Sequence, residues 1–128
     1  MLNLPESFNQ FLTPEECTQI DGTLLPTRDR FSIRITVYSW RYLRQVSQGL
    51  GIGIADLQPQ QITDWLRQDS SLQAQELADE SFMDLFGRLL ISALAPLQKI
   101  AQQENVEIEA LTLPQIIAWF EAHVKAAL

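Results

Sequence analysis

The stretch that decides the fold is TRDRFSIRITVYSWRYLRQVSQ, residues 27–48. From Asp29 to Val37 its odd positions are largely apolar and its even positions are polar, which is typical of a strand. On a helix of about 3.6 residues per turn, the same stretch has two apolar strips. One strip spans about 80° and consists of Phe31, Ile35, Tyr38, Tyr42 and Val46; the other consists of Ile33, Val37 and Trp40.

A strand at this place needs a partner strand, and the chain has no second convincing run of alternating residues. A helix with apolar strips on two sides is typical of a central helix that packs on both sides. We therefore predict one helix over residues 27–48. The alternative is an α+β fold with a short strand near residues 30–37.

Further helices are predicted on either side of this one. Residues 80–104 keep apolar steps of three and four, with Pro96 inside the pattern and Asn105 at its end. A kink at Pro96, or a split at Ala95, is expected because proline removes a backbone hydrogen bond. Shorter helices are predicted at 5–12, from Thr13 to about 22–25, at 59–69, after Ser70, and from 112 to 128.

The 128 residues suit one domain, so the sequence predicts a single all-α domain over 1–128. We expect a bundle of about five or six helices. The two long helices, 27–48 and 80–104, are predicted to pack against each other at its centre, because both carry long apolar patterns.

Composition excludes much catalytic chemistry. The chain has one cysteine, Cys17, and one histidine, His123, so neither an internal disulfide nor a zinc site rich in these residues can form. Gly49-Leu50-Gly51-Ile52-Gly53 lacks the rest of a phosphate-binding loop. No motif indicates an enzyme, a metal or a cofactor. The sequence contains no long apolar run and no basic, apolar leader at its start, so we expect a cytoplasmic protein outside the membrane.

The net charge is −7, but the charge is unevenly placed. Residues 28–44 hold five arginines and one acid, a local +4, which leaves −11 for the rest. On a helix, Arg30, Arg34, Arg41 and Arg44 lie within about 80° of one another. Arginine binds carboxylates through a rigid fork and, like aromatic residues, is enriched at interface hot spots. We therefore predict that a surface binds an acidic partner through Arg30, Arg34, Arg41, Arg44, Tyr38 and Trp40. The alternative is internal pairing with the chain's own acids.

No stretch matches the residue pattern of a known family. In style, as a small, acidic, glutamine-rich and helical chain, it resembles bacterial adaptors and assembly factors that hold another protein, including those of photosynthetic or carbon-fixing complexes. We predict a non-enzymatic interaction or assembly-chaperone protein that binds an acidic protein and forms a homodimer. The alternative is a regulatory protein that binds DNA or a transcription complex, with Gln60, Gln61, Thr63 and Arg67 as base-reading residues. Because the charge is negative, nucleic acid is the less expected partner.

Overall fold

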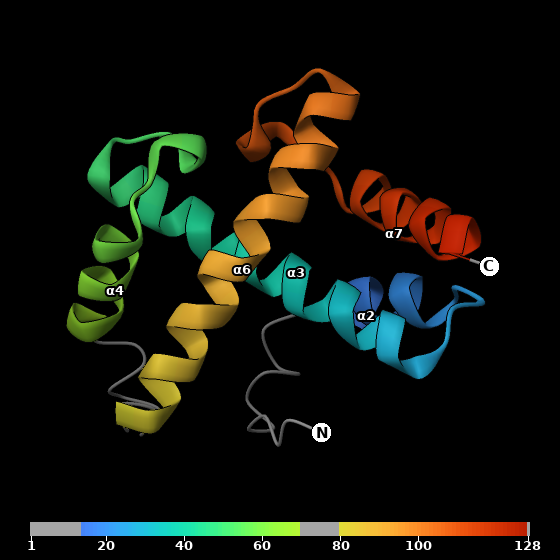
Figure 1. Cartoon of the computed structure of the whole chain (residues 1–128), viewed down its shortest axis with the longest axis horizontal. Coiled ribbons are helices and arrows are strands. Elements are labelled where there is room, and N and C mark those ends of the chain that lie inside the picture. Colours follow the sequence, from blue (N-terminus) through green and yellow to red (C-terminus); the bar gives the residue numbers. More distant parts are fainter. Residues whose placement is uncertain (1–13, 70–79, 128) are drawn as a thin grey trace. The chain divides into compact units, whose positions relative to one another are not determined.

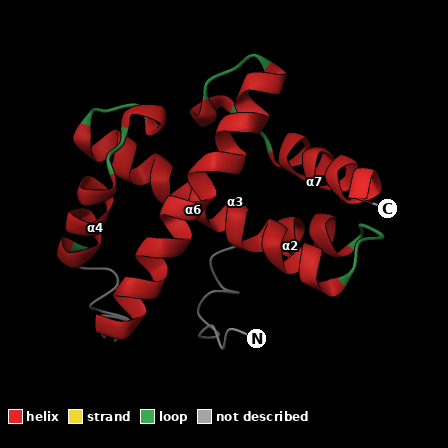
Figure 2. Ribbon diagram, in the orientation of Figure 1, coloured by secondary structure: helices red, strands yellow, loops and turns green. Residues whose placement is uncertain are grey.

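The computed structural model describes residues 14–69 and 80–127, and every element within these ranges is helical (Figures 1 and 2). In chain order they are α2 (Pro14–Asp21), α3 (Thr27–Leu50), the 3₁₀ turn η1 (Ile54–Asp56), α4 (Pro59–Gln68), α6 (Glu80–Glu104), the 3₁₀ turn η2 (Ile108–Ala110) and α7 (Leu113–Ala127). The all-α prediction is confirmed. The alternative of a strand near residues 30–37 is wrong, because these residues lie inside α3.

Burial along α3 explains why the helix prevails over the strand pattern. Ile33, Val37 and Leu43 are fully buried, and the burial extends to Tyr42 and Val46 on the other apolar strip. Both predicted strips are therefore largely buried, although Phe31 at the start of one of them is exposed. In a strand, alternate side chains point to opposite faces, so only the apolar face of this segment would be buried. In the helix, two apolar strips can pack against neighbouring elements.

The described residues form two compact units. Unit 1 contains residues 14–38 and 112–127, and unit 2 contains residues 39–69 and 80–111. Helix α3 contributes its first half to unit 1 and its second half to unit 2. The single domain predicted over residues 1–128 stays a prediction.

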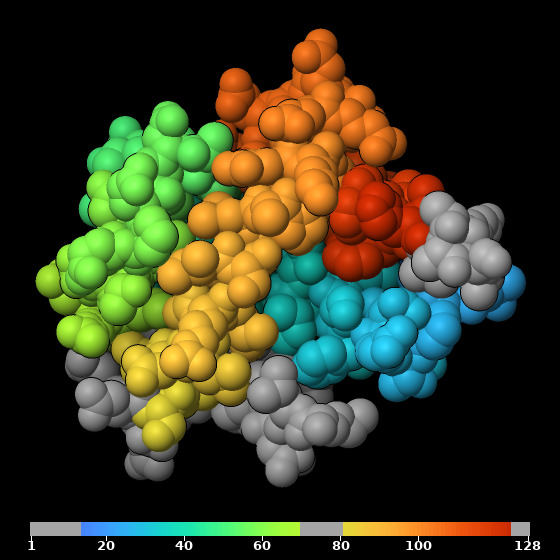
Figure 3. Space-filling model, viewed as in Figure 1, coloured from blue at the N-terminus to red at the C-terminus, as the bar shows by residue number. Residues whose placement is uncertain are grey.

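Unit 2 is built from the second half of α3 with α4 and α6. The rings of Tyr42 in α3 and Phe86 in α6 lie 5.1 Å apart, so the two long helices pack against each other here as predicted. Helices α4 and α6 also pack together, and their atoms form one continuous surface in green, yellow and orange (Figure 3). Helix α6 continues through Pro96, so the expected split at Ala95 does not occur.

The end of α3 differs from the sequence-based expectation. The predicted helix ends at residue 48, whereas α3 runs to Leu50. The residue in the left-handed conformation is Gly51, whose φ is 67°. Its N–H donates to the carbonyl of Ser47 at 2.9 Å, and so does the N–H of Ile52 at 3.2 Å. A glycine in this conformation after the last turn satisfies carbonyls that the helix leaves unpaired.

Unit 1 consists of α2, the first half of α3 and α7. Ile20 and Ile116 are fully buried, as are Ile33 and Val37 of α3, and Ile117 is nearly buried. On α7, the rings of Trp119 and His123 are stacked with centroids 3.9 Å apart. The expected helix at 5–12, the Thr13 cap and the turns after Ser70 lie outside the described residues. None of the helices in the described part of the chain is long and apolar enough to cross a membrane.

Candidate functional site

The first part of the predicted arginine surface lies in unit 1, where α3 carries Arg30 and Arg34 one turn apart. Nη2 of Arg34 donates to Oδ1 of Asp21, with which it forms an ion pair. Asp21 ends α2, where a negative charge is unfavourable to the helix dipole, and Arg34 offsets it. Nη2 of Arg30 donates to Oγ1 of Thr27 at 3.1 Å. The Arg34 side chain keeps 32% of its surface exposed, whereas Tyr38 keeps only 6%.

The second part lies in unit 2 and is organised around Trp40. Its ring is 7% exposed, and its Nε1–H donates to the carbonyl oxygen of Ile108 at 2.9 Å. The guanidinium carbon of Arg44 lies 4.9 Å from the centre of the Trp40 ring, a cation–π contact. Arg41 and Arg44 are both half-buried. Trp40 thus connects α3 to η2.

The six predicted partner-binding residues differ in how accessible they are to a partner. Tyr38 and Trp40 pack inside the chain, so the arginines form the accessible part of the set. The Arg34–Asp21 pair agrees with the alternative of internal charge pairing. Binding of a partner by these residues stays a prediction.

Helix α4 carries the residues that the DNA-binding alternative requires. Oε1 of Gln61 accepts from the N–H of Gln58 at 2.8 Å, and Oγ1 of Thr63 donates to the carbonyl of Pro59 at 3.0 Å. Nε2 of Gln60 donates to Asp64 at 2.8 Å. Three of the four expected base-reading side chains thus make hydrogen bonds within the α4 segment, a geometry that does not favour DNA reading.

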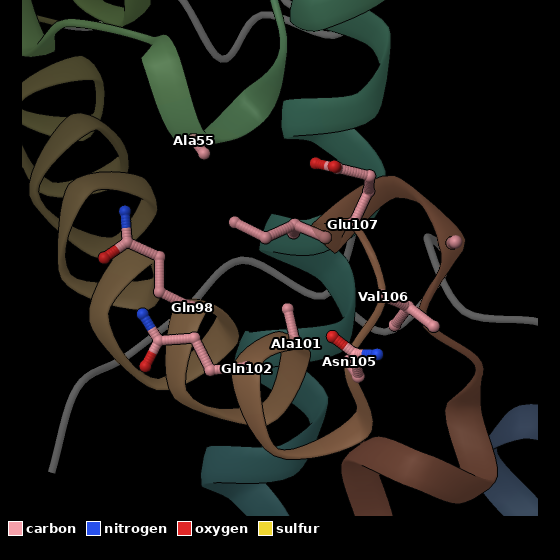
Figure 4. A pocket seen from close by; sticks show the side chains of 9 residues that line it. Ala55, Gln98, Ala101, Gln102, Asn105, Val106 and Glu107 are labelled. Carbon is pink, nitrogen blue, oxygen red and sulfur yellow. The ribbon is translucent and has the colours of Figure 1, made fainter.

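A cleft that no sequence motif indicated lies in unit 2, where the C-terminal end of α6 meets η1 and η2. Its volume is about 580 Å³. Buried Ala101 and Ile108 line its inner part. The side chains of Gln98 and Gln102 project from α6, while Glu107 stands on another side (Figure 4). All three polar residues are exposed, so the cleft is open to solvent.

Hydrogen bonds hold the walls of this cleft in place. The N–H of Ile54 in η1 donates to Oε1 of Glu109 in η2 at 2.7 Å, which joins the two turns. The Trp40 bond to Ile108 joins η2 to α3. Asn105 ends α6 with a φ of 55°, a left-handed conformation that asparagine tolerates well. These bonds fix the relative positions of α3, η1 and η2.

The cleft has polar carboxamide side chains around an apolar inner part. Gln98, Gln102 and Asn105 supply carboxamides, and Glu107 supplies a carboxylate. None of the described residues that line it is a lysine or arginine. A carboxamide both donates and accepts hydrogen bonds, so the lining can pair with other amides and attract a cation.

One sequence signal of this cleft was available. Gln98 and Gln102 follow one another by four residues, which places them on one face of a helix, and Asn105 comes three residues later, just after α6 ends. The other walls come from η1 and η2, whose residues fall between the predicted helices and for which no element was predicted. In the described part of the chain, no three acidic, histidine or cysteine residues gather as a metal site requires.

Comparison with protein-family models gives a match to the NDH complex assembly factor CRR9 over residues 12–127. Searches of curated proteins and of solved structures found no match. The matched range covers both units, and it includes the arginines of α3 and every residue of the cleft. The chain therefore belongs to the family of the NDH complex assembly factor CRR9.

Proposed function

We propose that this protein is a non-enzymatic assembly factor that binds a protein component of the NDH complex. The observation that carries the proposal is the family match over residues 12–127. The fold is compatible with it, because the described residues offer half-buried arginines and a polar cleft as surfaces for a protein. The cytoplasm is the proposed place of action.

The finer part of the proposal is that the bound component presents acidic side chains to α3. Arg30, Arg34, Arg41 and Arg44 would receive them, with Tyr38 and Trp40 holding the helix in place. Each guanidinium has five N–H donors, and the hydrogen bond of Arg34 to Asp21 uses only one of its nitrogens. A partner carboxylate can therefore join Asp21 on the same arginine.

The proposal is tested in the native host with a tagged protein expressed at its natural level. We expect components of the NDH complex to co-purify with it, and we expect deletion of its gene to lower the amount of assembled NDH complex. Untagged cells provide the control for purification, and re-expression of the wild-type chain provides the control for deletion. Normal levels of assembled complex in the deletion strain, with no co-purified component, would overturn the proposal.

A further inference from the structure

We propose that the cleft at the C-terminal end of α6 binds an extended polypeptide segment that carries a lysine or arginine side chain. The identity of the partner rests on the proposed function, whereas the chemistry of the segment rests on the cleft alone. The site is separate from the arginines of α3, because none of them lines it.

The form of the cleft suits a chain segment. Its inner part is buried and apolar at Ala101 and Ile108, and its rim is exposed and polar at Gln98, Gln102 and Glu107. Val106, which is 38% exposed, adds an apolar side chain to the lining. A buried apolar centre with a polar rim is the usual anatomy of a protein interface.

The carboxamides indicate what the segment presents. An extended polypeptide exposes N–H and C=O groups along its edges, and these need partners when water is displaced. Gln98, Gln102 and Asn105 each offer both a donor and an acceptor, so they can pair with either kind of main-chain group. When the main-chain groups of a bound segment supply the affinity, the side chains of that segment determine the specificity.

The charge indicates which side chain fits. Glu107 is the charged residue of the lining, and exposed Asp56 follows the lining residue Ala55 in the chain. Lys99 is exposed on α6 but does not line the cleft. Complementarity therefore favours a basic side chain opposite Glu107 and disfavours an acidic segment.

The cleft also needs little rearrangement for binding. The Ile54–Glu109 and Trp40–Ile108 hydrogen bonds fix its walls. A site that is already formed loses little conformational freedom when a segment binds, so a short segment can bind it measurably.

A random-peptide library, selected on the full-length protein, tests this inference. We expect the enriched peptides to share a lysine or arginine beside small or apolar residues. Ala55→Trp fills the cleft from an exposed position, and Glu107→Lys reverses its charge. Each variant should weaken binding of the enriched peptides by at least about tenfold in Kd, measured by calorimetry.

Two matched controls come from exposed residues of α6 that do not line the cleft. Glu104→Lys makes the same charge change as Glu107→Lys, and Gln103→Ala removes a carboxamide from the same helix. Both should keep wild-type affinity, and circular dichroism should show that all four variants retain the wild-type helix content. The inference is overturned if no peptide is enriched, if enriched peptides lack a basic residue, or if the controls lose affinity as the cleft variants do.

The two proposals fail separately. If the library selects cleft-dependent basic peptides but wild-type protein captures no NDH component, the proposed function fails and the peptide site stands. If wild-type protein captures an NDH component but the library selects nothing that depends on Ala55 and Glu107, only the peptide site fails.

Discussion

The indole ring of Trp65 lies so close to Gly49 that a Cβ atom built on Gly49 would be 2.1 Å from Cη2 of the ring. Trp65 belongs to α4, and Gly49 lies in the last turn of α3. The glycine is thus required by the approach of another helix. This contact gives glycine a role inside a helix, where it is otherwise unfavourable.

Gly49→Ala should destabilise the protein, although alanine normally favours a helix over glycine by about 1 kcal/mol. The new methyl group would push the Trp65 ring aside, and such overpacking costs about 1–3 kcal/mol. Urea unfolding measures the change. Gly87→Ala is the control, because its Cβ would lie 3.6 Å from Cδ1 of Leu66, an ordinary contact. This control should be neutral or stabilising, and equal behaviour of the two variants would contradict the prediction.

Trp40→Phe should lower the free energy of unfolding by about 1 kcal/mol for the lost buried hydrogen bond, plus a contribution of similar order from the smaller ring and the cavity that it leaves. The carbonyl of Ile108 keeps its 3.2 Å bond from the N–H of Leu111, so it is not left without a partner. Trp119→Phe is the control, since that half-buried ring is stacked on exposed His123. A larger loss of stability in the control than in Trp40→Phe would show that the Ile108 bond contributes little.

Glu109→Ala should free the N–H of Ile54 and loosen η1. A hydrogen bond to a charged group contributes about 1.5–3 kcal/mol, so a loss of stability of that order is expected. Glu109→Gln keeps an oxygen acceptor at the same place and should retain most of the stability. Hydrogen exchange at the Ile54 amide measures the effect locally. The prediction fails if this amide exchanges at the wild-type rate in Glu109→Ala.

Arg34→Glu combined with Arg41→Glu should abolish co-purification of the NDH component and any self-association, because each change places a negative charge against an acidic partner. The fold should survive with a lower melting temperature. The lost, half-exposed Arg34–Asp21 pair is worth less than about 1 kcal/mol. Co-purification measures binding of the NDH component, ultracentrifugation measures self-association, and thermal melting measures the stability of the fold.

The control for this double variant is Arg67→Glu with Arg88→Glu, which changes two exposed arginines outside the predicted surface by the same charge. It should keep the wild-type association. If the α3 double variant instead unfolds, the arginines serve internal pairing. If it melts and associates as wild type does, they have neither role.

In the part of the chain that the structure describes, the sequence by itself determined where the α-helices lie. Residues 27–48 and 80–104 were predicted as helices, and α3 and α6 end within two residues of these limits. The prediction of these helices is correct because both signals are local. Helix hydrogen bonds join residues four apart, and the apolar strips repeat every three or four residues. Of the two outcomes expected at Pro96, the split at Ala95 is wrong because α6 is continuous, and the kink stays a prediction.

Tertiary structure alone decided which of the singled-out side chains are buried and where a cleft opens. Trp40 was predicted as a partner residue, but Ile108, 68 positions away, accepts its hydrogen bond inside unit 2. The cleft is held by the bond between Ile54 and Glu109, 55 positions apart. Such contacts depend on the angle and position at which helices cross. The spacing of residues within one helix does not determine which residues of another helix will contact it.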